Sequence, residues 1–184
     1  LFAARASRRK VSMEQFELAK DKVIMGAERR SIVMPEQERL NTAYHESGHT
    51  VVAKALADRT DPVHKVTIIP RGRALGVTMQ LPEEDRYSHN REHLLARIAV
   101  LMGGRIAEEV FMDQMTTGAA NDFEQATGLA QNMVQRWGMS DHLGPRVYGD
   151  NNSEVFLGRD VTTQKNISNA TAEQVDQEVS RIIE

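Results

Sequence analysis

Residues 35–57, PEQERLNTAYHESGHTVVAKALA, predict a single long helix around which the rest of a domain can pack. Pro35 fixes φ near the value of a first helical turn, and Glu36 and Glu38 lie near the positive end of the helix dipole. Apolar residues continue through the stretch and supply packing contacts. We therefore expect a helix from about Pro35 to Ala57.

The motif His45-Glu46-Ser47-Gly48-His49 lies near the middle of this helix and indicates a zinc hydrolase. His45 and His49 are four residues apart, so a helix places both imidazoles on one face, where they can bind one zinc ion with Glu46 beside it. The alternative is a surface helix with two solvated histidines. Gly48 lowers helix propensity by about 1 kcal/mol relative to Ala, so we expect another backbone to approach it closely.

The composition limits the other possibilities. A chain of 184 residues suits one sizeable core, or one domain with a fragment of another. Its net charge of −3 gives no reason to expect nucleic acid, and apolar runs such as Ile98–Met102 are too short to span a bilayer. We also expect no signal peptide. Cysteine is absent, so any metal must be held by histidines and carboxylates.

The remaining pattern predicts a mainly α fold with a small β-sheet or hairpin. Two segments rich in β-branched residues predict short strands at Val63–Ile69 and Gly76–Leu81. Apolar residues at helical spacing predict helices at 91–112, at 121–137 and from Thr171 onward. The Gly103-Gly104 pair should allow a kink or tight helix packing. Gly149–Ser153 predicts a mobile loop.

The first thirty residues differ from the rest because bases outnumber acids there. Ser12 with Gln15 forms a capping-box signal, and a short amphipathic helix is predicted after it. This segment has too little apolar surface to be a domain alone, so we interpret it as a linker or the tail of a preceding domain. An arm that binds nucleic acid is the less favoured alternative, since acids are interleaved with the bases.

A catalytic zinc site usually takes three protein ligands, so a third must be found. The metzincin spacing is not met, because Val52 and Ala55 occupy the positions of its glycine and third histidine. The carboxylate candidates are Glu83, Glu84, Asp85, Glu108, Glu109 and Asp122. Asp122, at the start of a helix, is either a ligand or an ordinary acid at a helix N-terminus. Glu108, inside a helix, is its main rival, as a ligand or as an acceptor for an imidazole N–H.

Several stretches match one known family in order along the chain. They are Phe16–Ser31 (FELAKDKVIMGAERRS), Leu40–His49 (LNTAYHESGH), Asp61–Thr78 (DPVHKVTIIPRGRALGVT), Gly103–Glu109 (GGRIAEE), Thr117–Asp122 (TGAAND) and Val155–Arg159 (VFLGR). Across nearly its whole length the chain resembles the protease portion of the FtsH family, the membrane-anchored, ATP-dependent AAA zinc metalloproteases. Such separate matches are more specific than the five-residue metal motif. The fold implied is a helical metalloprotease domain with HExxH on a central helix.

The resemblance also implies the roles of the site residues. The zinc ligands would be His45, His49 and Asp122, with one Zn²⁺ per chain. Glu46 would be the catalytic base, and Glu108 would orient a zinc ligand without binding the zinc itself. The zinc would polarise a bound water, whose proton Glu46 would take and later return to the departing amine.

Domain organisation and partners follow from the same resemblance. Residues 1–30 would be the C-terminal end of an AAA ATPase lid with its linker, and 31–184 a zinc metalloprotease domain with a truncated C-terminal helix. No G-x-x-x-x-G-K-[ST] motif occurs, so we expect no ATPase activity, and ATP would be needed only by an absent ATPase domain. The implied substrates are misfolded membrane proteins and short-lived cytosolic proteins. The implied assembly is a homo-hexamer at a bacterial inner membrane, on the cytoplasmic side, or at an organelle membrane, with membrane contact only through absent N-terminal segments.

Substrate binding and competing functions complete the expectations. Gly76, Val77 and Thr78 are candidate substrate-binding residues, because an extended peptide can pair with a strand edge through backbone hydrogen bonds. A plain structural edge strand is the alternative. Two other functions compete with proteolysis: a catalytically silent zinc-binding or assembly scaffold, and a zinc hydrolase of small molecules. Glu46 argues against the scaffold, because a purely structural zinc site needs no carboxylate in that place and is more often closed by four protein ligands.

Overall fold

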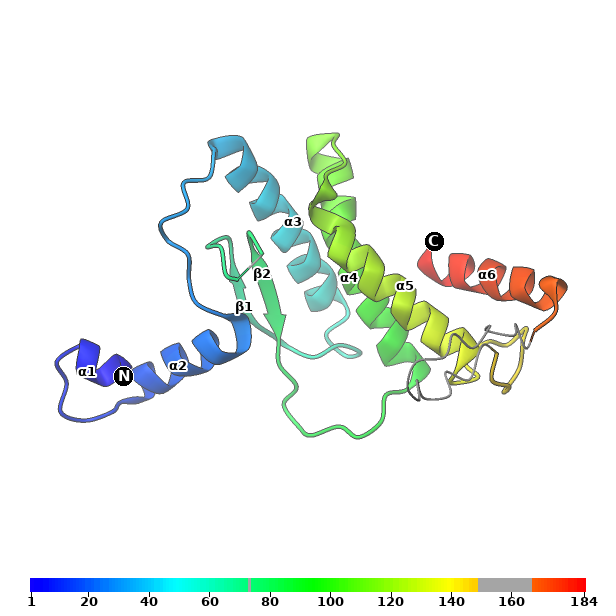
Figure 1. Ribbon diagram of the computed structural model, residues 1–184, viewed down its shortest axis with the longest axis horizontal. Helices are drawn as coiled ribbons and strands as arrows, with labels where there is room; N and C mark the ends of the chain where they lie inside the picture. The colour runs from blue at the N-terminus through cyan, green and yellow to red at the C-terminus, as the bar shows by residue number, and fades with distance from the viewer. Residues whose placement is uncertain (73, 149–166) are drawn as a thin grey trace, which may run out of the picture. The chain divides into compact units, whose positions relative to one another are not determined.

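The structure, a computed structural model, describes residues 1–72, 74–148 and 167–184. In chain order its elements are α1 (Phe2–Arg5), α2 (Met13–Met25), α3 (Glu36–Ala55), β1 (Val63–Thr67), β2 (Val77–Gln80), α4 (Arg91–Met112), the 3₁₀ turn η1 (Thr117–Ala119), α5 (Ala120–Gln135) and α6 (Asn169–Ile183) (Figure 1). The loop predicted at Gly149–Ser153 lies outside the described residues. Among the described residues, no helix combines the length and the apolar character needed to span a membrane.

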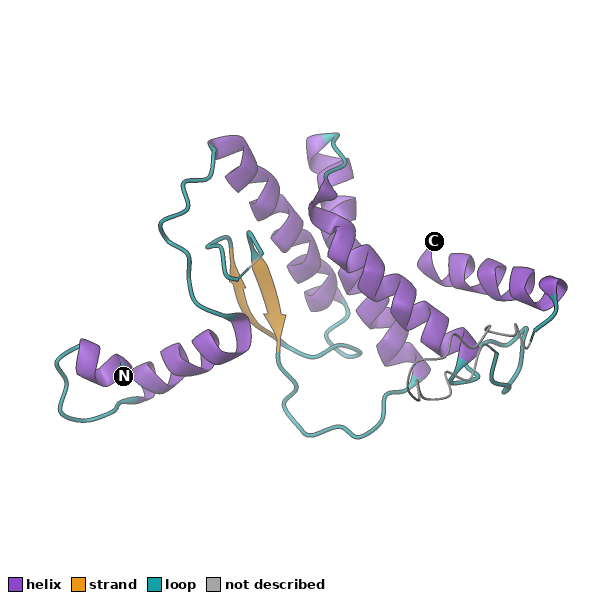
Figure 2. Cartoon of the chain, in the orientation of Figure 1, coloured by secondary structure: helices purple, strands orange, loops and turns teal. Residues whose placement is uncertain are grey.

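The predicted fold class is confirmed. Helices make up most of the described chain, and β1 and β2 form a two-stranded antiparallel sheet (Figure 2). The starts of α2 and α3 agree with the local signals that predicted them, whereas α3 ends at Ala55 and α5 at Gln135, two residues before the predicted ends. The capping box of Ser12 and Gln15 begins α2, and Pro35 directly precedes the first residue of α3.

The described chain divides into two compact units. The first contains Leu1–Arg86 and Gly103–Thr116, and the second contains Tyr87–Met102 and Thr117–Glu184. Helix α4 therefore contributes its first half to the second unit and its second half to the first.

In the first unit, the sheet lies against the long helix α3. Both strands contact α3, and β1 pairs with β2 in the register Val66 to Thr78 and Thr67 to Val77. The pairing is irregular between Val63 and Lys65. Because the strand register is fixed beside α3, the side chain of Thr78 has a defined position relative to this helix.

The N-terminal segment is attached to the hairpin by charged groups. Arg71, only 5% exposed, donates to the carbonyl of Gly26 at 3.1 Å and to Glu28 Oε1 at 2.5 Å. Lys65 on β1 forms an ion pair with Asp21 on α2. The Lys65 ammonium holds the pKa of the Asp21 carboxyl below its usual value of 3.8, against the opposing effect of burial. Polar contacts rather than an apolar core hold α2 in place.

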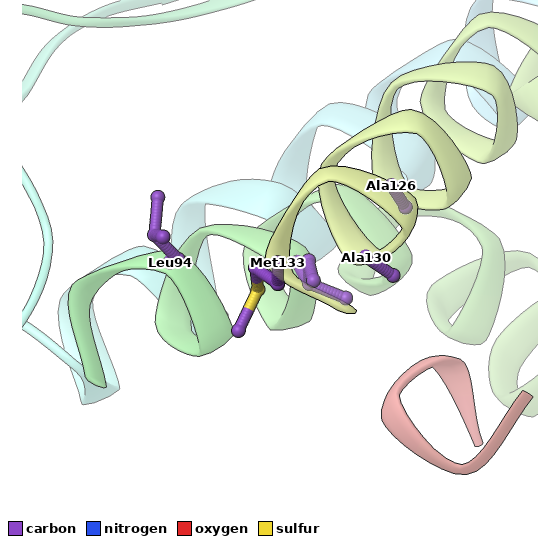
Figure 3. Close-up of a cluster of buried hydrophobic side chains, with 5 residues drawn as sticks. Leu94, Ala126, Ala130 and Met133 are labelled. Carbon is purple, nitrogen blue, oxygen red and sulfur yellow. The ribbon is translucent and has the colours of Figure 1, made fainter. Parts of the chain in front are cut away.

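The second unit has the larger apolar core. Leu94 and Ile98 of α4 pack with Ala126, Ala130 and Met133 of α5, and Figure 3 shows this cluster. Apolar residues of α6 cover it, namely Val179, Ile182 and Ile183. The three helices are therefore joined by burial of apolar side chains, the main favourable term in folding.

A buried acid on α6 also bonds to the segment that follows α5. Glu178 is 6% exposed and accepts hydrogen bonds from Ser140 Oγ at 2.8 Å and from Arg181 Nε at 3.0 Å. The Arg181 guanidinium is the largest influence on this carboxyl, and with the Ser140 hydroxyl it lowers the pKa of Glu178 below 4.5, although burial opposes the shift. The carboxylate is thus stabilised in its charged form in the folded state.

Candidate metal centre

Helix α3 brings two imidazoles of the first unit to one point. The Nε2 atoms of His45 and His49 lie 3.0 Å apart, and the two rings meet edge to face with centroids 4.6 Å apart. Two nitrogens bound to one tetrahedral zinc at about 2.0–2.1 Å would lie about 3.3 Å apart. Only a small separation of the rings is needed to admit the ion between them. Both histidines therefore fit a zinc site through Nε2.

The other ring nitrogen of His45 is held by a buried carboxyl group. Glu108, 2% exposed, lies 2.8 Å from His45 Nδ1 through its Oε1, and the backbone N–H of Thr116 donates to its Oε2 at 3.0 Å. Because the carboxyl group acts as an acceptor, we assign the proton to Nδ1, which leaves the Nε2 lone pair for a metal. This geometry is the one expected of a carboxylate that orients a metal-binding histidine through its other ring nitrogen.

Glycines of α4 make the space that the imidazoles occupy. A Cβ added at Gly104 would lie 2.5 Å from His49 Nε2 and 2.7 Å from His45 Cε1. A Cβ added at Gly48 would lie 2.2 Å from the carbonyl oxygen of Gly103. Both distances are too short for any side chain without movement. The close backbone approach expected at Gly48 is present, and the Gly103-Gly104 pair serves tight helix packing.

Strand β2 holds the carboxylate of Glu46, which is 6% exposed. Thr78 Oγ1 donates to Glu46 Oε2 at 2.6 Å and lies 3.1 Å from the Glu46 carbonyl oxygen. A Cβ added at Gly76 would lie 2.6 Å from Glu46 Oε1. Thr78 of β2 and Gly76, the residue directly before β2, thus lie near the two carboxylate oxygens, and Glu46 has a defined orientation.

The other carboxylate candidates are placed as follows. Asp122 lies half-buried in the first turn of α5, directly after η1. It belongs to the second unit, so its role as a zinc ligand stays a prediction. Glu109 is exposed and pairs with Arg105 at 2.7 Å, and the acids at 83–85 are also exposed.

A second group in the first unit has ligand atoms close together. Glu17, Asp21 and His64 each offer one ligand atom, all within 4.8 Å of one another. However, Lys65 forms an ion pair with Asp21, and Lys20 lies 2.5 Å from Glu17. These ammonium groups already supply the positive charge that a cation would bring, so we interpret the group as an ion-pair cluster that joins α2 to β1.

Two contributors to the site were not predicted from the sequence. The hydroxyl of Thr78 contacts Glu46, whereas the sequence suggested only a backbone role for this strand. Gly104 borders the imidazoles, although the sequence indicated only general packing at that position. The Gly103-Gly104 pair was the available signal, because two adjacent glycines in a helix are costly unless a close neighbour requires them.

Comparisons with known proteins identify the family and the relatives of this chain. Residues 32–184 match the family described as Peptidase family M41. Proteins named "ATP-dependent zinc metalloprotease FtsH" are similar over 100% of this chain: the one from Magnetococcus marinus is 59% identical and the one from Cupriavidus metallidurans 58%. The protein of the same name from Caulobacter vibrioides is 55% identical, again over the whole chain. The chain covers 27%, 28% and 30% of these relatives, respectively.

Proposed function

Because the chain belongs to Peptidase family M41, we propose that it is the zinc-dependent endopeptidase domain of an ATP-dependent, membrane-bound protease. The family match confirms the resemblance drawn from the sequence and its assignment to the peptidases. The single observation that carries the proposed chemistry is the convergence of the His45 and His49 Nε2 atoms on the helix that also bears Glu46. The names of the relatives supply the metal, zinc.

The chain's own groups suit a zinc site with an open position. His45 and His49 would bind through Nε2, with Glu108 fixing the orientation of the first ring. Asp122 is the proposed third ligand, since a carboxylate in the first turn of a helix is held on rigid backbone. When bound, zinc lowers the pKa of a coordinated water and stabilises the charge that develops on a substrate carbonyl.

Glu46 is the proposed general base and acid. Its carboxylate would accept the proton of the attacking water and then deliver it to the departing amine of the cleaved peptide bond. Burial and the Thr78 hydrogen bond limit the orientations that the side chain can adopt. General acid–base catalysis of this kind contributes typically about 10²- to 10⁴-fold to the rate.

Strand β2 is the proposed substrate-binding edge. In the described part of the chain the sheet consists of β1 and β2 alone, so one edge of β2 has no strand partner. Gly76, Val77 and Thr78 would pair with an extended substrate through backbone hydrogen bonds, which tolerates many side-chain sequences. The contact between Thr78 and Glu46 supports this choice, because it shows that the strand adjoins the proposed base.

The properties of the whole protein are part of the same proposal. Residues 1–30 would be the end of an AAA ATPase lid with its linker, and 31–184 the protease domain. The protein would assemble as a homo-hexamer at a bacterial inner membrane and degrade misfolded membrane proteins and short-lived cytosolic proteins. The names of the relatives support the dependence on ATP.

The test is the exchange of Glu46 for glutamine. Glu46→Gln keeps the shape of the side chain but removes its basicity, so we expect the holoenzyme to retain zinc and lose at least about 10²-fold in casein cleavage. Glu109→Gln is the matched control, because this glutamate of α4 is exposed and pairs with Arg105, and it should behave as wild type.

Each opposing result points to another assignment. Cleavage that persists in Glu46→Gln would exclude Glu46 as the base. A wild-type protein that binds zinc and does not cleave casein would instead be a silent scaffold or a hydrolase of small molecules. Cleavage that persists after zinc is removed by a chelator would exclude the metal mechanism.

A further inference from the structure

We propose that Thr78 is a positioning residue whose hydroxyl holds the Glu46 carboxylate in the orientation required for proton transfer. The inference rests on the proposed function, because it gives Thr78 a part in the same reaction. It adds a role for the side chain of a strand that otherwise contributes only its backbone to substrate binding. Thr78, Glu46, Gly76 and Thr50 all belong to the first unit.

The first observation is the length of the hydrogen bond. A hydroxyl carries a single proton, and the 2.6 Å contact from Thr78 Oγ1 to Glu46 Oε2 is in the range of strong O–H···O⁻ bonds, whereas the 3.1 Å contact to the Glu46 carbonyl is weaker. The carboxylate therefore receives the main donation. Glu46 is 6% exposed as a residue, so its carboxylate needs such donors to offset the loss of water around it.

The second observation is the close packing around the other carboxylate oxygen. A Cβ at Gly76 would lie 2.6 Å from Glu46 Oε1, 2.7 Å from Glu46 Cγ and 2.7 Å from Thr42 Cγ2. Oε1 thus lies against the strand at Gly76 while Thr78 holds Oε2. The hydrogen bond of Thr78 to Oε2 and the small space left beside Oε1 at Gly76 together limit rotation of the carboxylate about its last side-chain bond.

The third observation separates positioning from simple stabilisation. The Glu46 carbonyl already accepts a hydrogen bond from Thr50 Oγ1 at 2.8 Å, so the Thr78 hydroxyl is not required for that group. The distinctive contact of Thr78 is the one with the carboxylate. Because misplacement of a catalytic group by about 1 Å can cost about 10²-fold in rate, losing this contact should lower kcat more than it alters substrate binding.

Three variants of the holoenzyme test the proposal. Thr78→Val keeps the shape and the strand propensity and removes the hydroxyl; Thr78→Ser restores a hydroxyl; Thr50→Val removes a hydroxyl that donates to the Glu46 carbonyl oxygen. The measurements are kcat and KM for a fluorogenic peptide, together with the zinc content of each variant. Zinc content verifies that the site in Thr78→Val is still formed.

We expect Thr78→Val to lose about 10- to 100-fold in kcat, with KM within about twofold of wild type and one zinc retained. Thr78→Ser should recover most of kcat, and Thr50→Val should match wild type. An unchanged kcat in Thr78→Val, a defect confined to KM, or a Thr78→Ser variant as slow as Thr78→Val would each overturn the proposal. A wild-type protein without peptidase activity would overturn the proposed function itself, and that outcome is visible before any variant is compared.

Discussion

The two units of the chain bury different kinds of side chain. In the first unit, the buried residues around the histidine helix include Glu46, His49 and Glu108, each in polar contact with a neighbour. In the second unit, the main buried cluster is apolar and includes Leu94 and Met133. The difference teaches that the first unit is built to orient polar groups, whereas the second is built mainly for stability. Substitutions in the apolar cluster of the second unit should therefore act mainly on folding, and substitutions at the buried polar residues of the first unit mainly on catalysis.

The glycines repeat this contrast. Gly48, Gly76 and Gly104 of the first unit each lie where an added Cβ would come within 2.7 Å of another atom. Gly128 on α5 of the second unit has nothing within 4 Å of such a Cβ. A larger residue would clash at the three glycines of the first unit, whereas Gly128 could be replaced by alanine without a clash.

The largest expected effect tests the apolar core. Met133→Ala should lower the free energy of unfolding by about 3 kcal/mol, because it removes a fully buried side chain and leaves a cavity. Calorimetric unfolding measures the change, and zinc content should remain that of wild type. Loss of zinc without loss of stability would contradict the separation of the two units.

The second prediction tests the histidine pair of the first unit as a zinc site. Gly104→Ala should weaken zinc binding by about 10- to 100-fold, since the methyl group would lie 2.5 Å from His49 Nε2 and displace the ring. Competition with a chromogenic chelator measures the affinity. If the variant binds zinc as tightly as wild type, the imidazoles do not occupy the space over Gly104.

A smaller effect concerns acid and the attachment of α6. The pKa of Glu178 is lowered below 4.5 in the folded state, chiefly by Arg181, so the charged form stabilises folding. This contribution is complete above the unfolded pKa, near 4.5, and is lost as the pH falls through the lower folded pKa. Melting temperatures measured from pH 7 to pH 3 should therefore show the advantage of wild type over Glu178→Gln shrinking below about pH 4.5.

The control for this experiment is Glu173→Gln, an exposed acid on the same helix, which should follow wild type at every pH. Asp21 and Glu28 of the first unit also have lowered pKa values, so wild type alone loses stability in acid for several reasons. Only the difference between wild type and Glu178→Gln isolates one carboxyl group. A constant difference across the pH range would contradict the assignment.

The smallest expected effect is a gain. Gly128→Ala should raise the free energy of unfolding by about 0.5–1 kcal/mol, because alanine favours the helix and its methyl group meets no other atom. Chemical denaturation at neutral pH measures this change. A loss of stability would show that Gly128, like the glycines of the first unit, is required by a close neighbour.

The sequence predicts much of this organisation, because its signals are local. Pro35 before α3, the capping box at Ser12 and the spacing of His45 and His49 each depend on a few neighbouring residues. The hydroxyl contact of Thr78 with Glu46 could not be predicted, since the two residues are 32 positions apart and meet only through the register of the sheet. Local patterns determine which elements form, and tertiary packing determines which side chains meet.

The most direct test of the central claim is the position of zinc in crystals of the holoenzyme, located by anomalous scattering at the zinc absorption edge. We predict one zinc per chain at about 2.0–2.1 Å from the Nε2 atoms of His45 and His49, with Glu108 still on His45 Nδ1. Zinc bound through Nδ1, or found at Glu17, Asp21 and His64 with the histidine pair empty, would contradict the account.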